Sequence, residues 1–401
     1  MHPLMKHVHR LSVQIGPRGS GTEQEARAAA WLVQKFKTLG YHVSVNEFKT
    51  VGSFSYVQLL FFGGILAAFG LSFVQPLLAA LLALLLLALY ILDVETRFSL
   101  APFAAKQTSQ NIRAWFEEDA TSYIRETANE ERPDSIVIMA HYDSSRAALN
   151  FHPKMVKGFR SSFFLVFASL TAITFFLVLR SIPVFSPWEA GLVWASVPFA
   201  VYLGIVMLML AHRELFCSYT PGANDNASGV AVLLGIAARL KKHPVPGLNV
   251  EFVATGAEEA GTFGCLEYIK QYGLEGKTFI NLDNLGKGRL FAAEAEGILR
   301  HYAADPELLA QVRSVVKYAP ALPVETRPYR LLTTDATPIL TRGGRAVSIM
   351  ACDDDGLLPN WHWVTDTAAH VEPQNLKLAE ELVYRILQER GRVFHDTETT
   401  G

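Results

Sequence analysis

The chain has 401 residues, of which 50% are hydrophobic and only 18% are charged, and its formal net charge is −2. This composition is too apolar for an ordinary soluble enzyme and indicates membrane-spanning segments. The charge is balanced, so no nucleic acid is expected as a partner. The 3 cysteines lack metal-site spacing, and we expect free thiols in a reducing compartment rather than a disulfide.

Segment 1–52 has the pattern of a helix followed by a strand. Its N-terminus lacks the apolar core and small-residue cleavage site of a signal peptide, so we expect none. Thr22 and Glu25 have the spacing of a capping box for a helix over about 23–39. Residues 41–48 alternate between polar and apolar side chains, which predicts an edge strand.

Segment 53–94 contains two nearly uncharged runs, 54–73 and 77–92, separated by Gln75 and Pro76. Crossing the hydrocarbon core takes about 20 residues, so the first run is long enough and the second is slightly short. The pair predicts a transmembrane hairpin; a buried hairpin of a soluble protein is the alternative. Small residues at helical spacing in the first run suit close helix contact and a homo-oligomer.

Segment 95–150 returns to soluble character. It predicts a strand over 110–116, a polar loop over 117–134 and a buried strand over 135–140. Segment 151–215 then holds a second uncharged pair, 162–179 and 191–211, which predicts a second transmembrane hairpin.

The two hairpins place all polar segments on one side of the membrane. Basic residues cluster there, while Arg180 stands alone at a hairpin tip; they are Lys49, Arg97, Lys106, Lys154, Lys157, Arg160 and Arg213. By the positive-inside rule we expect a multi-pass protein of a bacterial plasma membrane with its polar domain in the cytoplasm.

Segment 216–401 alternates helices and strands, which is typical of an α/β sandwich around a mixed or parallel sheet. Helices are predicted near 227–241, 263–273, 306–317 and 374–390, and strands near 249–255, 278–283, 289–293 and 346–351.

Histidines and carboxylates follow several of these strands. They are His141 and Asp143, Glu258 and Glu259, Asp283, and His362 in a late loop. Asp225 lies in a Gly-rich turn before a helix, where it is either a simple cap or a ligand. Because residues beyond the carboxyl ends of strands converge in an open sheet, these side chains predict a site for a divalent metal such as zinc.

These stretches resemble the co-catalytic two-zinc metallopeptidases, which include bacterial aminopeptidases, glutamate carboxypeptidases and glutaminyl cyclases. The matching motifs are His141-x-Asp143, Pro-Gly-Ala-x-Asp-Asn-Ala-Ser-Gly over 221–229, Glu258-Glu259-x-Gly261, Asn281-Leu-Asp283, and His362 with Asp366-Thr367. The resemblance implies a three-layer α/β/α sandwich around a mixed, largely parallel sheet. The four transmembrane helices are then two hairpins inserted into the peptidase domain, which comprises 1–52, 95–150 and 216–401.

The resemblance also implies the roles of the site residues. Asp225 would bridge two zinc ions, with His141 and Asp283 completing one site and Glu259 and His362 the other. Glu258 would be the general base that activates the metal-bridging water. Asp143, and Asp366 near the last histidine, would orient the imidazoles, and the peptide bond after Asp225 is expected to be cis. Other divalent metals are also compatible with these ligands.

The chain departs from the family pattern at the position expected to stabilise the substrate carbonyl. Some relatives carry a tyrosine beside the last histidine, whereas Trp361 and Trp363 flank it here. Tyr329 and the loop 333–335 are predicted to line the substrate pocket. Residues 353–355 predict a solvated acidic loop, with capture of a substrate amine as the alternative.

The function predicted on these grounds is a membrane-anchored zinc aminopeptidase, a hydrolase that removes N-terminal residues from peptides. Its expected partners are a peptide substrate and the lipid bilayer. A dipeptidase or carboxypeptidase is the alternative, and it needs a basic pocket for which Arg327 and Arg330 are the candidates. A transporter and a non-catalytic membrane scaffold are further alternatives. The absence of charge within the four apolar runs disfavours the transporter, and the intact ligand set disfavours the scaffold.

Overall fold

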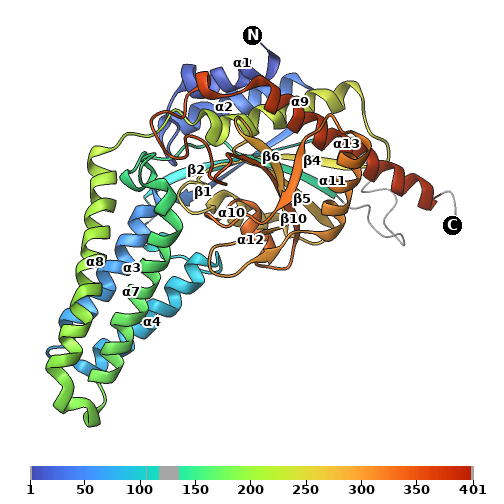
Figure 1. Cartoon of the computed structure of the whole chain (residues 1–401). Helices are drawn as coiled ribbons and strands as arrows, with labels where there is room; N and C mark the ends of the chain where they lie inside the picture. The colour runs from blue at the N-terminus through green and yellow to red at the C-terminus, as the bar shows by residue number, and fades with distance from the viewer. Residues whose placement is uncertain (1, 105, 117–134, 399–401) are drawn as a thin grey trace. The chain divides into compact units, whose positions relative to one another are not determined.

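The computed structural model describes residues 2–104, 106–116 and 135–398, so the polar loop predicted over 117–134 lies outside the described residues. The described chain divides into two units (Figure 1). One comprises residues 1–52, 106–145 and 219–401, and the other comprises 53–105 and 146–218.

The first unit is built on an eight-stranded sheet. Its strands in spatial order are β1 (His42–Thr50), β2 (Gln107–Trp115), β4 (Asn249–Thr255), β3 (Ser135–His141), β5 (Lys277–Leu282), β10 (Arg345–Cys352), β6 (Arg289–Ala293) and β9 (Val324–Arg327). The central strands β4, β3, β5 and β10 are parallel, and β1 and β2 pair antiparallel with their neighbours. β6 pairs antiparallel with β10 and parallel with β9. The predicted mixed, largely parallel sheet is therefore confirmed, with β1 at its edge.

Helices cover both faces of this sheet. Those of the first face are α1 (Pro3–His9), α2 (Glu23–Thr38), α9 (Gly229–Lys242), α11 (Pro306–Tyr318) and α13 (Pro373–Glu398), and those of the second are α10 (Phe263–Tyr272) and α12 (Ala336–Leu340). β3 shows why two layers are needed. Ile136 and Ile138 join the core under the first face, whereas Val137 and Met139 join the core under the second.

Several short elements were not predicted from the sequence. These are α1 and the π-helix that follows it (Arg10–Ile15), the strand β9, the helix α12 and the two-stranded ladder of β7 (Ala295–Glu296) and β8 (Tyr302–Ala303). Each is too short for a clear periodicity.

The predicted capping box of α2 is only half formed, which corrects the interpretation of Glu25. The Thr22 hydroxyl accepts a hydrogen bond from the Glu25 N–H at 3.3 Å, as predicted. The Glu25 carboxylate does not return to Thr22; it accepts from the Gly21 N–H at 2.7 Å and is fully buried. The reason is tertiary, because Ser109 and Ala257 supply its other donors.

The second unit is made of apolar helices: α3 (Phe54–Leu71), α4 (Pro76–Val94), the short α5 (Ala101–Ala104), α7 (Phe159–Arg180) and α8 (Glu189–Phe216). Four stretches are long and apolar enough to cross a membrane: Phe54–Leu71, Pro76–Val94, Val156–Arg180 and Pro183–Phe216. α4 has 19 residues, more than the run predicted from the sequence, which gives it a length of about 28 Å. Membrane insertion itself stays a prediction.

The outer surface of this unit is apolar. Leu77, Leu81 and Leu85 lie one turn apart on α4 and are 63%, 56% and 55% exposed. Such a continuous exposed apolar stripe is typical of a surface that faces lipid or another apolar partner.

His7 provides a pH test of the N-terminal packing. Its ring contacts Trp31, and burial together with the charges of Lys35 and Lys6 lowers its pKa to about 4. An unfolded histidine titrates near 6.5, so the unfolded chain takes up the proton first as pH falls. The stability that neutral His7 contributes is complete above pH 6.5 and is lost as pH falls toward 4. We expect wild type to lose about 1–2 kcal/mol more than His7→Phe between pH 7.5 and pH 5 in denaturant unfolding.

The control is His243→Phe, which removes an exposed histidine and should keep the wild-type pH profile. An unchanged profile for His7→Phe would show that His7 titrates normally in the folded protein.

Candidate metal centre

Six predicted side chains gather at one edge of the central sheet. His141 ends β3, Glu258 and Glu259 follow β4, Asp283 follows β5, Asp225 precedes α9, and His362 lies in the loop after β10. These strands are parallel, so their carboxyl ends meet at the same edge. All six side chains are 10% exposed or less.

The side chains form two triads that share Asp225. In the first, His141 Nε2 lies 3.2 Å from Asp225 Oδ1 and 3.4 Å from Asp283 Oδ1. In the second, His362 Nε2 lies 3.1 Å from Asp225 Oδ2 and 3.0 Å from Glu259 Oε2. The two oxygens of Asp225 therefore face different triads. The simple helix cap considered for Asp225 is excluded, because α9 begins at Gly229.

The donor atoms fit zinc. Zinc binds imidazole nitrogen and carboxylate oxygen at about 2.0–2.2 Å, so tetrahedral ligand atoms lie about 3.3 Å apart. The histidine-to-carboxylate separations within the triads, 3.0 to 3.4 Å, match this spacing. In addition, Glu259 Oε1 is buried without a hydrogen-bond partner among the described residues. Each triad offers three protein ligands, which is the number found in catalytic zinc sites.

The charge balance also favours cations here. Burial raises the pKa of Glu258 and of Glu259, although the charges of His141 and His362 act against this shift. Burial alone would lower the pKa of His362, but the charges of Glu259 and Asp225 outweigh it and raise the pKa to about 9. Several carboxylates crowded into a buried site are costly unless cations compensate them.

Glu258 lies between the triads. Its carboxylate groups with His141, a ligand of the first triad, and with Glu259, a ligand of the second. The Glu258 Oε2 atom is 3.9 Å from His141 Nε2. At this position, beside both triads, the carboxylate would be able to act as a base on a water held by a metal ion bound there.

The turn before α9 has a constrained backbone. Gly222 has φ +61°, and a Cβ there would lie 2.5 Å from the Ser144 Cβ and 2.7 Å from the Asp225 carbonyl oxygen, so only glycine fits. The peptide bond between Asp225 and Asn226 is cis, as the family resemblance predicted.

Asp366 has a different place from the one predicted for it. We expected it to orient the imidazole of His362. Its two carboxylate oxygens instead accept hydrogen bonds from the backbone N–H groups of Asn224 and Asp225, at 2.6 and 3.1 Å. It therefore holds the turn that carries the shared ligand.

Asp143 supports the loop of the base as well as a histidine. Its Oδ1 lies 3.4 Å from His141 Nδ1. The same carboxylate accepts hydrogen bonds from the N–H groups of Glu258 and Glu259, both at 3.1 Å. Asp143 is fully buried beneath these residues, so it acts on the reaction by positioning them.

Two important residues were missed as parts of the site. Arg18 is fully buried and donates to the carbonyl oxygens of Tyr142 at 2.8 Å, Pro221 at 2.7 Å and Gly222 at 2.9 Å. It thereby ties the end of β3 to the turn of Asp225. Burial lowers its pKa to about 10, so it stays charged beside the acidic site.

Glu25 is the second missed residue. Its Oε1 accepts from the Ser109 hydroxyl at 2.7 Å and from the Ala257 N–H at 3.1 Å, next to the base. Burial raises its pKa to about 8. Sequence alone gave no signal for either role, because both depend on contacts between distant segments; Arg18 was visible only as part of a family-like opening segment.

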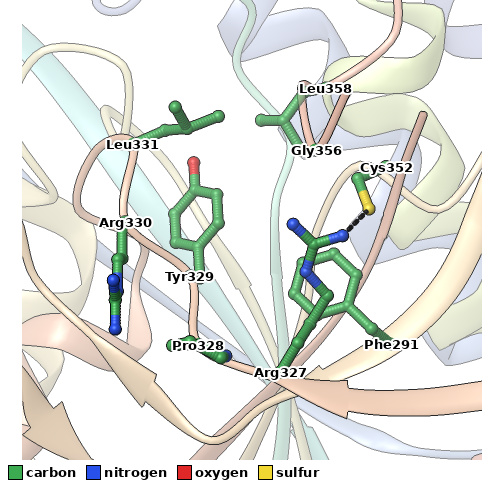
Figure 2. A pocket seen from close by; sticks show the side chains of 9 residues that line it. All are labelled: Phe291, Arg327, Pro328, Tyr329, Arg330, Leu331, Cys352, Gly356 and Leu358. Atoms are coloured by element: carbon green, nitrogen blue, oxygen red, sulfur yellow. Dashed lines mark hydrogen bonds between the residues drawn. The ribbon is translucent and has the colours of Figure 1, made fainter. Parts of the chain in front are cut away.

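A cavity of about 270 Å³ is lined by aromatic, aliphatic and arginine side chains (Figure 2). Tyr329, Arg327 and Arg330 line it, and its use as the substrate pocket stays a prediction. The loop 333–335 does not line it; Asp335 is buried and accepts a hydrogen bond from the Thr255 hydroxyl at the end of β4. In the acidic loop, Asp354 is 92% exposed and pairs with Arg289 at 2.8 Å, as a solvated loop predicts.

Part of the sequence matches a known protein family. The model of "Peptidase family M28" matches residues 205–387, which include Asp225, Glu258, Glu259, Asp283 and His362. The match spans less than half of the chain, and it confirms the predicted resemblance.

Two curated relatives match shorter stretches. Aminopeptidase YwaD of Bacillus subtilis is 45% identical over 64 residues, and the alkaline phosphatase isozyme conversion protein of Escherichia coli is 41% identical over 68 residues. Each match covers 16% of this chain, and only 14% and 19% of the respective relatives.

Solved structures share the fold over most of the chain. A zinc aminopeptidase from Bacillus subtilis has a TM-score of 0.55 at 17% identity, with 97% of this chain and 94% of that chain covered. A glutaminyl cyclase from Bacteroides thetaiotaomicron bound to N-acetylhistamine has a TM-score of 0.55 at 16% identity, with 96% of each chain covered. At these identities the likeness establishes the fold.

Asp143→Asn tests whether the loop of the base depends on this carboxylate. An amide offers one acceptor where two backbone N–H groups need acceptors, so the loop should shift. Removing a side chain that orients metal ligands typically lowers metal affinity or activity by about 10–100-fold. We expect zinc affinity, measured by competition with a chelating dye, to fall within this range.

The matched control is Asp354→Asn, which changes an aspartate on the surface and should leave zinc affinity unchanged. Equal zinc affinity for Asp143→Asn and wild type would mean that the loop is held by other contacts.

Proposed function

We propose that this protein is a membrane-anchored di-zinc aminopeptidase that removes N-terminal residues from peptides. The observation that supports this most directly is the pair of ligand triads sharing Asp225, with Glu258 beside both. The family match and the likeness to zinc aminopeptidases favour peptide-bond hydrolysis on this fold.

His141, Asp225 and Asp283 would hold one zinc ion, and Asp225, Glu259 and His362 the other. Bound here, the ions would lower the pKa of a water and polarise the scissile carbonyl. Glu258 then accepts a proton from the attacking water and delivers it to the leaving amine nitrogen. Asp143 keeps the backbone of Glu258 in place during both transfers.

Tyr329 is our candidate for hydrogen bonding to the carbonyl oxygen. Its phenol is buried in the cavity wall, and burial together with the charge of Asp283 raises its pKa, so it remains a donor at neutral pH. Tyr329 would donate the hydrogen bond to the carbonyl oxygen that a tyrosine beside the last histidine donates in some relatives. In this chain Trp361 and Trp363 flank that histidine.

The apolar second unit is proposed as the membrane anchor. Its four candidate spans have suitable length and hydropathy, and α4 presents a leucine stripe on its outer surface. The bilayer is the partner proposed for this surface, with the catalytic unit in the cytoplasm and with association of copies through the helices.

The experiment is a substrate panel for detergent-purified protein that is stripped of metal by chelation and then reloaded with zinc. Aminoacyl anilides should be cleaved only after reloading, and the same peptides with blocked N-termini should resist. The panel includes an N-terminal glutaminyl peptide, because glutaminyl cyclases share the fold. Cyclisation of that peptide without hydrolysis of the others would contradict an aminopeptidase.

Glu258→Gln separates the base from the ligands. The amide cannot accept the proton, so kcat should fall by about 10²–10⁴-fold, the usual contribution of a general base. Metal content, measured by elemental analysis, should match wild type because the triads stay intact.

Glu267→Gln is the control, since Glu267 lies on α10 and pairs with the exposed Lys270. If Glu258→Gln retained the kcat of wild type, Glu258 would not be the general base.

A further inference from the structure

The cavity beside the metal centre is lined by two arginines, Arg327 and Arg330, and by mainly apolar side chains, and the contacts of Arg327 hold its guanidinium in place. Arg327, the last residue of β9, stands with its guanidinium 5.2 Å from the centre of the Phe291 ring. Its Nη1 atom donates to Cys352 Sγ at 2.9 Å (Figure 2). A Cβ on Gly356 would lie 2.6 Å from Arg327 Nη2, so this glycine leaves room for the guanidinium.

Arg327 forms no ion pair with any residue in the described part of the chain. Other arginines near it do: Arg289 pairs with Asp354, and Arg313 pairs with Glu294. A guanidinium that is fixed in place and has a neutral thiol as its hydrogen-bond partner keeps donors available for an anion. A planar carboxylate suits these donors best, because it accepts two parallel hydrogen bonds.

The cavity adjoins the metal centre through two of its walls. Tyr329 is close enough to Asp283 and Asp225 for their charges to act on its phenol. Leu358 lies on another wall and precedes Pro359. The carbonyl of Pro359 accepts a hydrogen bond at 3.1 Å from the side chain of Asn224, the neighbour of Asp225. A substrate with its scissile bond at the metals would therefore extend its next group into this cavity.

The volume limits what the cavity holds. Pockets for whole drug-sized ligands occupy roughly 300–1,000 Å³, so a cavity of about 270 Å³ suits one residue. Apolar walls such as Leu331 and Leu358 would hold the methylene groups of such a residue, while Arg327 would bind its end.

We propose that Arg327 determines specificity by binding a carboxylate of the peptide substrate. This inference rests on the proposed function and narrows its substrate class to peptides that place a carboxylate in the cavity. The carboxylate has two sources: the side chain of an N-terminal aspartate or glutamate, or the C-terminal carboxylate of a dipeptide.

The kinetic experiment compares glutamyl and glutaminyl anilides, and dipeptides with their C-terminal amides. These pairs differ in one carboxylate only. We expect wild type to prefer the acid in one pair, which identifies its source. Arg327→Met keeps the aliphatic stem and should reduce kcat/KM for that acid by about 10–100-fold, the contribution of a charge-assisted hydrogen bond. The neutral partner should change by less than about threefold, and zinc content should stay the same.

Arg313→Met is the matched control, because it removes an exposed arginine of α11 outside the cavity. It should leave the preference intact. Equal kcat/KM for acid and amide in both pairs, or an equal loss for acid and amide in Arg327→Met, would overturn the proposal.

A binding measurement separates this proposal from the proposed function. Glutamate and glutamine are titrated calorimetrically into zinc-loaded wild type and Arg327→Met. If wild type cleaves no peptide but binds glutamate more tightly than glutamine, and Arg327→Met loses the difference, the anion site stands and the peptidase assignment fails. Equal affinities in wild type for glutamate and glutamine, together with equal affinities for a dipeptide and its C-terminal amide, remove the anion site, whatever the catalytic result.

Discussion

Asp225 presents its two carboxylate oxygens to two different histidines, 3.2 and 3.1 Å away, in a site that is almost closed to solvent. Asp283 and Glu259 complete the two triads, so negative charge accumulates around a single shared side chain. Such a cluster is stable only when cations compensate it. The positions of the strand ends, the turn before α9 and the loop of Glu258 all serve this arrangement.

The supporting groups act mainly on backbone. Asp366 binds the N–H groups of the Asp225 turn, Asp143 binds those of Glu258 and Glu259, and Glu25 binds that of Ala257. Arg18 donates hydrogen bonds to the carbonyl oxygens of Tyr142, after the end of β3, and of Pro221 and Gly222, in the turn of Asp225. Buried ionisable side chains thus hold the loops of the site by hydrogen bonds to their backbones. They join distant parts of the chain, since Glu25 and Ala257 are 232 residues apart in sequence.

The sequence predicted the candidate ligands that the structure brings together, because each follows a strand or turn with strong local patterning. β3 ends at His141, and Asp283 follows β5 directly, so parallel pairing alone brings them together. Asp366, Arg18 and Glu25 were misjudged or missed, because their partners are backbone groups of distant segments. The strand β9, with only 4 residues, lacked periodicity, so the placement of Arg327 in the cavity wall required the fold.

Zinc stoichiometry of ligand variants tests the shared-ligand arrangement most directly. Wild type, His141→Ala, His362→Ala and Asp225→Ala are dialysed against the same weak chelator, and zinc per folded chain is measured by elemental analysis. The arrangement predicts about two zinc ions for wild type, about one for each histidine variant and none for Asp225→Ala. Two zinc ions retained by Asp225→Ala, or one in wild type that is unaffected by the loss of either histidine, would contradict it.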